Sequence, residues 1–131
     1  MTFFTVAHAL AAALFAQVLL LASPDSLAAS RPAGVKTVRV YNGAIAYHRE
    51  SASFGYAINA TTARDAQVEA LKQCGDSRCE VVARLRNDCG AVANGAKRFT
   101  VGKGVTRQEA ETKALRACGP GCAIAVWACT R

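Results

Sequence analysis

The chain has 131 residues, 52% of them hydrophobic, and its 16 Lys and Arg outnumber 9 Asp and Glu to give a formal net charge of +7. This length suits one small domain and excludes a large multidomain enzyme. Six cysteines in so short a chain indicate that disulfides supplement a small hydrophobic core.

Residues 1–28 have the order of a secretory signal peptide. An apolar run from Ala9 to Ala22 is interrupted only by Gln17, and it is shorter than the roughly 20 residues that span a bilayer. Pro24 breaks the run, and Ser26-Leu27-Ala28 then offers small residues for cleavage. We expect a secreted, periplasmic or envelope protein without a membrane span after cleavage. An uncleaved anchor is the alternative, because the segment has no Lys or Arg.

Cleavage after Ala28 removes Asp25 and no base, so the net charge rises by one, from +7 to +8. A basic protein of this kind favours an anionic envelope or host surface, or an acidic protein, and the association weakens as salt rises. Nucleic acid receives the least support. The alternative is that scattered Lys and Arg keep a small protein soluble.

Residues 29–36 contain Pro and Gly and predict a flexible lead-in. Beyond them, period-two alternation predicts strands with one buried face. In chain order the predicted strands are 38–40, 54–58, 81–86, 91–94, 99–102 and 124–129.

Two helices are expected, over residues 62–75 and 106–119. Each begins with a Thr and has an acidic residue three positions later, which satisfies free amide groups at a helix start. Each ends at a Gly, the residue that best adopts the left-handed conformation. Small residues recur at four-residue spacing and indicate close packing on a sheet. These residues are Ala66, Ala70 and Cys74 in the first helix, and Ala110, Ala114 and Cys118 in the second.

The chain contains an internal repeat. Gly43 to Ala46 recurs as Gly90 to Ala93, and the first helix recurs in the second at an offset of 44. Cys79 and Cys89 are taken as equivalent to Cys122 and Cys129. The pattern predicts one α+β domain at 37–131, made of two tandem strand-strand-helix-strand units at about 37–89 and 90–131. We expect an antiparallel-type sheet with two helices, internal pseudo-twofold symmetry and stabilising disulfides.

Three disulfides are predicted, although six cysteines permit 15 pairings. Short spacing places Cys74 near Cys79 and Cys118 near Cys122, across the end of each helix and the start of the next strand. Cys89 and Cys129 remain, and their bridge would join corresponding strand ends of the two units. The main alternative joins equivalent cysteines, Cys74 with Cys118 and Cys79 with Cys122.

The same cysteines have the spacing of a four-thiolate zinc site, but an oxidising destination favours disulfides. We therefore expect no metal and no cofactor. Three bridges also leave no thiol for nucleophilic catalysis. The best enzymatic candidates are His48 and Glu50, two residues apart on a predicted strand, which as base and acid could cleave a phosphodiester beside arginines. The structural alternative is a polar strand end that leads into a turn.

Arg84, Arg86 and Trp127 are candidate binding residues. In the predicted strands they point away from the apolar face, and Trp127 occupies the repeat position of Arg84. An indole beside guanidinium groups could stack on sugars or bases, or hold a cation. The alternative is that Trp127 fills a second layer of the core.

Several motifs together resemble a bacterial family of domains of unknown function, the one numbered 4189. They are Gly-Ala-Ile-Ala-Tyr at 43–47, Phe54-Gly55-Tyr56, the Ala-rich helix ending in Cys74-Gly75, then Cys79, and Val126-Trp127-Ala128-Cys129. The resemblance covers about residues 41–130. It implies an exported bacterial protein with one such domain and no assigned catalytic residue.

The sequence favours a non-enzymatic, secreted or envelope-associated binding module that recognises an anionic surface or a protein partner. The alternative function is a small secreted hydrolase, nuclease-like, that uses His48 and Glu50.

Overall fold

The computed structural model describes residues 34 and 36–131. The predicted signal peptide at 1–28 and most of the lead-in at 29–36 lie outside the described residues. Thr37–Arg131 forms one compact unit. Within the described part of the chain, none of the helices has the length and apolar content needed to cross a membrane.

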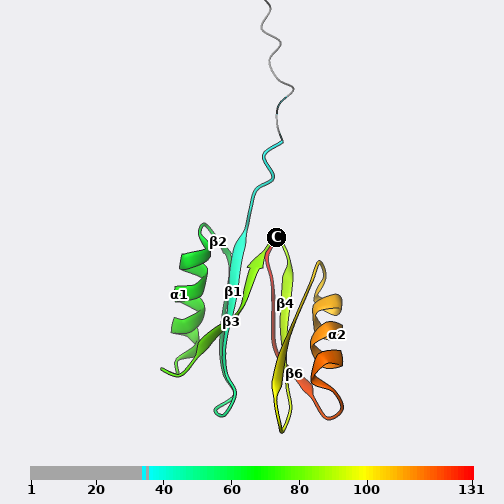
Figure 1. Cartoon of the computed structure of the whole chain (residues 1–131). Coiled ribbons are helices and arrows are strands. Elements are labelled where there is room, and N and C mark those ends of the chain that lie inside the picture. The colour runs from blue at the N-terminus through cyan, green and yellow to red at the C-terminus, as the bar shows by residue number, and fades with distance from the viewer. Residues whose placement is uncertain (1–33, 35) are drawn as a thin grey trace, which may run out of the picture. The chain divides into compact units, whose positions relative to one another are not determined.

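This unit contains six strands and two helices, as the α+β prediction requires (Figure 1). In chain order they are β1 (Asn42–His48), β2 (Ser53–Ala60), α1 (Ala63–Cys74), β3 (Glu80–Arg86), β4 (Cys89–Asn94), β5 (Phe99–Gly104), α2 (Arg107–Cys118) and β6 (Ala123–Cys129). The order strand, strand, helix, strand therefore occurs twice. Whether the halves arose by duplication stays a prediction.

The strands form two antiparallel sheets of three strands, in the orders β2-β1-β3 and β5-β4-β6. The expectation of a single sheet was wrong in this respect. Five consecutive residues are buried in each central strand, β1 and β4. A strand buried on both faces needs a covering layer on each side, and here one cover is a helix and the other is the opposite sheet.

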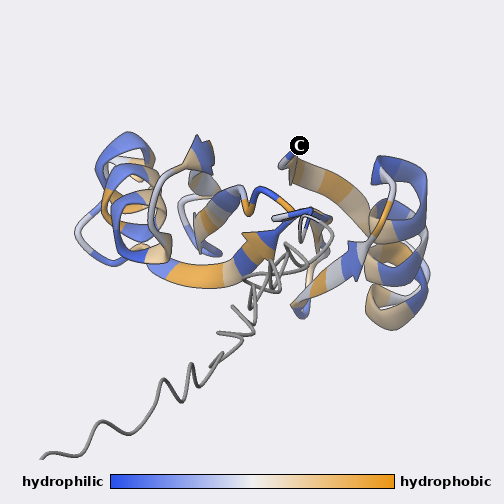
Figure 2. Ribbon diagram, turned by 90° about the horizontal axis from the view of Figure 1, so that it is seen from above, coloured by the Kyte–Doolittle hydropathy of each residue, from blue (hydrophilic) through white to orange (hydrophobic). Residues whose placement is uncertain are grey.

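The resulting layers are α1, the first sheet, the second sheet and α2, with the helices on the two outer sides (Figures 1 and 2). Each helix packs its small residues on its own sheet, as Ala66 and Ala70 do against Ala44 and Ala46. Between the sheets lies a third apolar cluster. Its buried members are Ile45, Tyr47, Ala83, Leu85, Val92, Val126 and Ala128.

Both helices begin as predicted, because the hydroxyls of Thr62 and Thr106 accept hydrogen bonds from the amides three residues later. Gly75 ends α1 in the left-handed region, with φ 71° and ψ −2°. Gly119 ends α2 with positive φ as well, but its ψ of −170° takes it out of that region.

The strand predicted at 38–40 is absent from the structure. Val38 is 78% exposed, and the ladder begins only at Asn42, which pairs with Ala60 and Arg86. Alternation in three residues was too short a pattern to indicate a strand: the Arg39 carbonyl accepts a hydrogen bond from the Asn87 side chain, and no described strand pairs with the segment. The first strand instead contains Gly43 to Ala46, which the sequence marked only as a repeat.

All six cysteines are paired, Cys74 with Cys79, Cys118 with Cys122 and Cys89 with Cys129. Spacing favoured the first two pairs, and the third is the pair that then remained. The position of the third bridge differs from expectation, since Cys89 begins β4 and Cys129 ends β6, its direct neighbour in the same sheet. The bridge therefore lies within the second sheet, and Cys89 is not the equivalent of Cys129.

Replacing Gly55 by Ala tests the close contact between β2 and α1. A Cβ at this position would collide with the backbone carbonyl of Ala70 and the amide of Cys74. Overpacking of this kind costs roughly 1–3 kcal/mol, so we expect Gly55→Ala to lower the free energy of unfolding by about 2 kcal/mol in urea titrations. Gly34→Ala is the control, because its Cβ meets no atom within 4 Å. Equal stability of both variants would contradict the prediction.

The disulfides should differ in their contribution to stability. Cys89 and Cys129 are 40 residues apart, whereas Cys118 and Cys122 are separated by 4. From the entropy of loop closure in the unfolded chain, removal of the first bridge should cost about 4 kcal/mol and removal of the second about 2 kcal/mol. Urea unfolding of the two paired Cys→Ala variants measures this difference. A larger loss for the shorter loop would contradict the loop-closure explanation.

Candidate functional site

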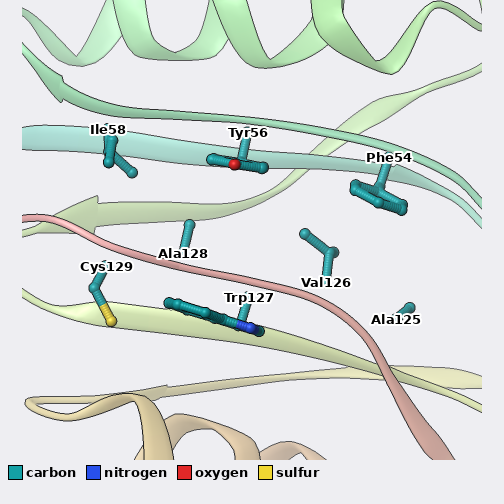
Figure 3. Close-up of a pocket in the computed structure, with 8 residues that line it drawn as sticks. All are labelled: Phe54, Tyr56, Ile58, Ala125, Val126, Trp127, Ala128 and Cys129. Atoms are coloured by element: carbon teal, nitrogen blue, oxygen red, sulfur yellow. The ribbon is translucent and has the colours of Figure 1, made fainter.

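A groove of about 360 Å³ lies between β2 and β6. One wall consists of Phe54, Tyr56 and Ile58, alternate residues of β2, and Val126 and Ala128 of β6 point toward them (Figure 3). The groove volume is at the low end of the range for small-molecule pockets, roughly 300–1,000 Å³. Its size suits a few apolar side chains.

The apolar side chains of this wall are exposed, although they lie on the face of the first sheet that is turned toward the second sheet. Phe54, Tyr56 and Ile58 are 46%, 41% and 44% exposed. The intervening residues Gly55 and Ala57 are small and lie against α1. The alternation therefore fixes the strand to the helix through its small residues and leaves three large apolar residues beside the groove.

The backbone of β2 is also open on one side. Among the described residues, β2 pairs only with β1, and its eight residues include no charge. One outer amide, that of Tyr56, reaches the side-chain oxygen of Gln73 at 3.5 Å. Edge strands in monomeric proteins usually carry charges or prolines that prevent pairing, and this strand has neither.

The sequence predicted the strand at 54–58 but not the groove. Three large apolar residues at period two, separated by Gly and Ala, were the available signal. The position of β6 beside them depends on the packing of the two sheets, for which local sequence gives no rule.

The structure does not bring the predicted binding residues together. Arg84 donates from Nε to Gln67 of α1 at 3.2 Å, and Arg86 is two residues further along the same strand. Trp127 points away from β2 (Figure 3) and lies beneath the Arg107 guanidinium of α2, 3.9 Å from the ring centroid. The arginines and the indole thus belong to opposite outer faces. Trp127 is 40% exposed, which places it at the surface with one ring face covered.

His48 and Glu50 do not share a strand face, as the enzymatic hypothesis required, and the structure agrees with the alternative of a polar strand end that leads into a turn. β1 ends at His48, and Glu50 lies in the following turn, where its carboxylate pairs with Arg78 at 3.3 Å. The turn is compact because Ser51 links two groups. Its Oγ lies 3.0 Å from His48 Nδ1 and 2.9 Å from Asp76 Oδ2.

The polar cluster of His48, Ser51 and Asp76 does not have the geometry of a hydrolytic site. In a hydrolytic triad the histidine lies between the hydroxyl and the carboxylate, whereas here the Ser51 hydroxyl reaches Asp76 directly. Hydrogen bonds from the Arg78 side chain and backbone, and then from Ser51, hold the pKa of Asp76 well below its usual range. The ion pair with Asp76 in turn raises the pKa of Arg78.

The four cysteines that had zinc-ligand spacing form the two short disulfides. Elsewhere in the part of the chain that the structure describes, no group of three His, Cys, Asp or Glu side chains has the arrangement of a metal site.

Comparison with known proteins identifies a family. The family model described as "Domain of unknown function (DUF4189)" matches residues 42–129. The uncharacterized protein Rv1813c of Mycobacterium tuberculosis is 41% identical over 90 residues, which cover 69% of this chain and 61% of the relative. The uncharacterized protein Mb1843c of Mycobacterium bovis gives the same values. The chain thus spans about three fifths of the length of these curated relatives.

A solved structure shows a similar fold. The NMR structure of Rv1813c from Mycobacterium tuberculosis matches with a TM-score of 0.57 and 36% sequence identity. The match covers 70% of this chain and 77% of the other.

The lowered pKa of Asp76 predicts a stability that depends on pH. A carboxylate whose pKa is lower in the folded protein contributes fully above its unfolded pKa, near 3.8, and loses that contribution as pH falls below it. We expect Asp76→Asn to be less stable than the native chain at pH 7, with a difference that shrinks between about pH 4 and pH 2. Urea unfolding at several pH values measures it. A constant difference across this range would contradict the prediction.

Proposed function

We propose that this chain, which belongs to the DUF4189 family, is an exported, non-enzymatic module that binds an extended segment of a partner protein in the groove between β2 and β6. The observation that carries the proposal is the row of exposed apolar side chains, Phe54, Tyr56 and Ile58, on an uncharged edge strand. A contiguous apolar surface beside a groove favours an interaction site.

An extended segment fits both features of β2. Its main chain would pair with the free edge, and alternate side chains would enter the groove, as in β-strand addition. The side chains opposite are short, since β6 contributes Val126 and Ala128. This leaves room for the apolar side chains of the partner, whose sequence should therefore alternate apolar and polar residues.

The charge of the protein indicates what kind of partner segment the groove would bind. The chain has a net charge of +7, while the groove strand itself is uncharged. Acidic residues at the polar positions of a partner would be attracted by the surrounding bases, and salt would weaken the association. The competing hypothesis is that the basic residues alone recognise an anionic surface, without the groove.

Export is part of the proposal. Three disulfides persist in oxidising compartments, in agreement with the signal-like order of residues 1–28. A secreted, periplasmic or envelope location would bring the groove into contact with exported or host proteins.

We also infer that the two halves derive from a duplicated unit. Gly55 lies opposite Ala46 and against the Ala70 carbonyl. At the corresponding place in the second half, Thr100 lies opposite Ala93 and donates to the Ala114 carbonyl at 2.7 Å. In the ladders Tyr56 lies opposite Ile45, and Val101 lies opposite Val92, the counterpart of Ile45, so Tyr56 corresponds to Val101. Apolar residues thus occupy these positions in both halves, but Phe99 and Val101 of β5 are half-buried, whereas Phe54 and Tyr56 of β2 are exposed.

The groove is tested with synthetic ten-residue peptides that alternate Val and Glu. We expect them to shift the backbone amide NMR signals of β2 and β6 in the oxidised protein. Tyr56→Lys should weaken binding at least tenfold, because it puts a charge into the apolar row. Val68→Lys is the matched control, since Val68 is exposed on α1 away from the groove, and it should bind the peptides as well as the native chain does.

A peptide with Pro in place of its central Val separates strand addition from simple charge attraction, because Pro cannot donate to a β-ladder. It should bind much more weakly than the parent. Equal binding of both peptides, or shifts confined to basic residues of the helices, would contradict the groove. Binding of anionic lipid vesicles that Tyr56→Lys leaves unchanged, without peptide binding, would favour the anionic-surface version instead.

A further inference from the structure

Two open sheet edges, one from each sheet, lie on the same side of the molecule. Among the described residues, β2 pairs only with β1, and β6 pairs only with β4. Both strands line the groove, so their free edges are close together. The other two edge strands, β3 and β5, lie at the far ends of the two sheets.

The two sides of the stacked sheets differ in charge. β2 and β6, with 8 and 7 residues, contain neither a charged residue nor a proline. β3 instead contains Glu80, Arg84 and Arg86, and β5 contains Lys103. Charges on an edge strand prevent it from pairing with another chain. One side is therefore protected against strand addition, whereas the side with the groove is open to it.

The exposed apolar side chains of the described strands are also on the open side. The large ones are Phe54, Tyr56 and Ile58 of β2 and Trp127 of β6. The three from β2 face the groove, and Trp127 points away from it (Figure 3). A partner that joined both edges would therefore cover apolar surface between the sheets and also on the outer face of the second sheet.

Tyr56 and Trp127 direct their backbone groups to the free edges. The Tyr56 amide points to Gln73 Oε1 of α1 at 3.5 Å, away from β1. In an antiparallel ladder, hydrogen-bonded pairs alternate with closer pairs that share no hydrogen bond. Cys89 and Cys129 have Cα atoms only 4.0 Å apart, which indicates a pair of the closer kind. Trp127, two residues before Cys129, therefore also has its amide and carbonyl on the open side.

We propose that a second copy of this chain pairs along both edges at once, β2 with β2 and β6 with β6. A single extended segment can pair with only one of the two edges, whereas a second copy presents two uncharged edges at the same spacing. A two-fold axis perpendicular to the sheets makes both pairs antiparallel. Tyr56 and Trp127 are level with each other along the strands (Figure 3), so one axis can pass near both.

The charges favour a dimer that closes. The chain has a net charge of +7, but the strands in contact bring no charged side chain of their own to the axis. Arg107, which covers the Trp127 ring, is already paired with Glu111 at 2.7 Å. Of the described strands, only the charged β3 and β5 then remain as edges, so pairing stops at two copies and does not continue into a filament.

The dimer would regulate the groove. In the dimer the apolar row of each β2 lies between the two chains, so a partner segment and a second copy compete for it. The single chain is then the form that binds the segment. This regulatory consequence rests on the proposed function, whereas the pairing itself follows from the two edges alone.

Sedimentation equilibrium of the full oxidised chain, without peptide, tests the pairing. From micromolar to millimolar concentration we expect an equilibrium between monomer and dimer with no larger species. Trp127 is the one tryptophan of the chain, so its fluorescence should shift to shorter wavelength as the dimer forms. Hydrogen exchange at the amides of Tyr56 and Trp127 should slow over the same concentration range.

Tyr56→Lys and Trp127→Lys test the two edges separately. Each substitution places two like charges opposite one another across the axis, which destabilises a strand pair. Each should raise the dissociation constant of the dimer by roughly tenfold or more, and urea unfolding of the dilute variants checks that they still fold. Val68→Lys is the matched control, because it adds the same charge at an exposed position of α1 and should dimerise as the native chain does.

Three results would overturn the proposal: a monomer at millimolar concentration, growth beyond two copies, or a dimer that either of the edge substitutions leaves unchanged. None of them affects peptide binding, which is measured on dilute protein. A dimer without peptide binding would instead leave the pairing in place and contradict the proposed function. If both hold, the Val and Glu peptide should dissociate the dimer.

Discussion

The packing of the two sheets against each other is the interaction on which the rest of the structure depends. Ile45 and Val92, each completely buried, lie in the middle of the two central strands. Because alanines occupy the opposite faces of these strands, each helix can approach its sheet closely. A core of small residues gains little free energy from each side chain, and the disulfides at the ends of the helices and across β4 and β6 compensate for this.

The groove and a polar pocket at the hairpin ends are both boundaries of that central packing. The groove lies where β2 extends beside β6 and its large apolar residues are only partly covered. The polar pocket lies at the hairpin ends, where Tyr47 and Phe99 close the cluster between the sheets. In the groove, side chains of the inner face are exposed because the opposing sheet ends beside them. The groove follows from the stacking of the layers, with no inserted loop or extra element.

Local signals predicted what local forces decide. Thr62 and Thr106 marked the helix starts, because an N-cap hydroxyl acts within three residues, and the short Cys spacings indicated the bridges at the helix ends. Local patterns could not predict how elements that are distant in the sequence pack against one another. Alternation placed Trp127 and Arg84 on equivalent faces correctly, yet those faces are opposite surfaces once the sheets stack. The polar residues after His48 indicated a strand end and a turn, but they could not indicate that the Glu50 carboxylate pairs with Arg78, which is far away in the sequence.

The difference between the halves bears most directly on function. Both halves place a small residue of the edge strand against the helix carbonyl, Gly55 at Ala70 and Thr100 at Ala114, so packing on the helix explains those positions. It does not explain Tyr56, which is exposed, where the other half has the half-buried Val101. An exposed aromatic on an uncharged edge adds a risk of self-association and little to the core. Such a residue is best explained by a partner that covers it, which is why the groove, rather than the scattered bases, provides the stronger basis for a binding function.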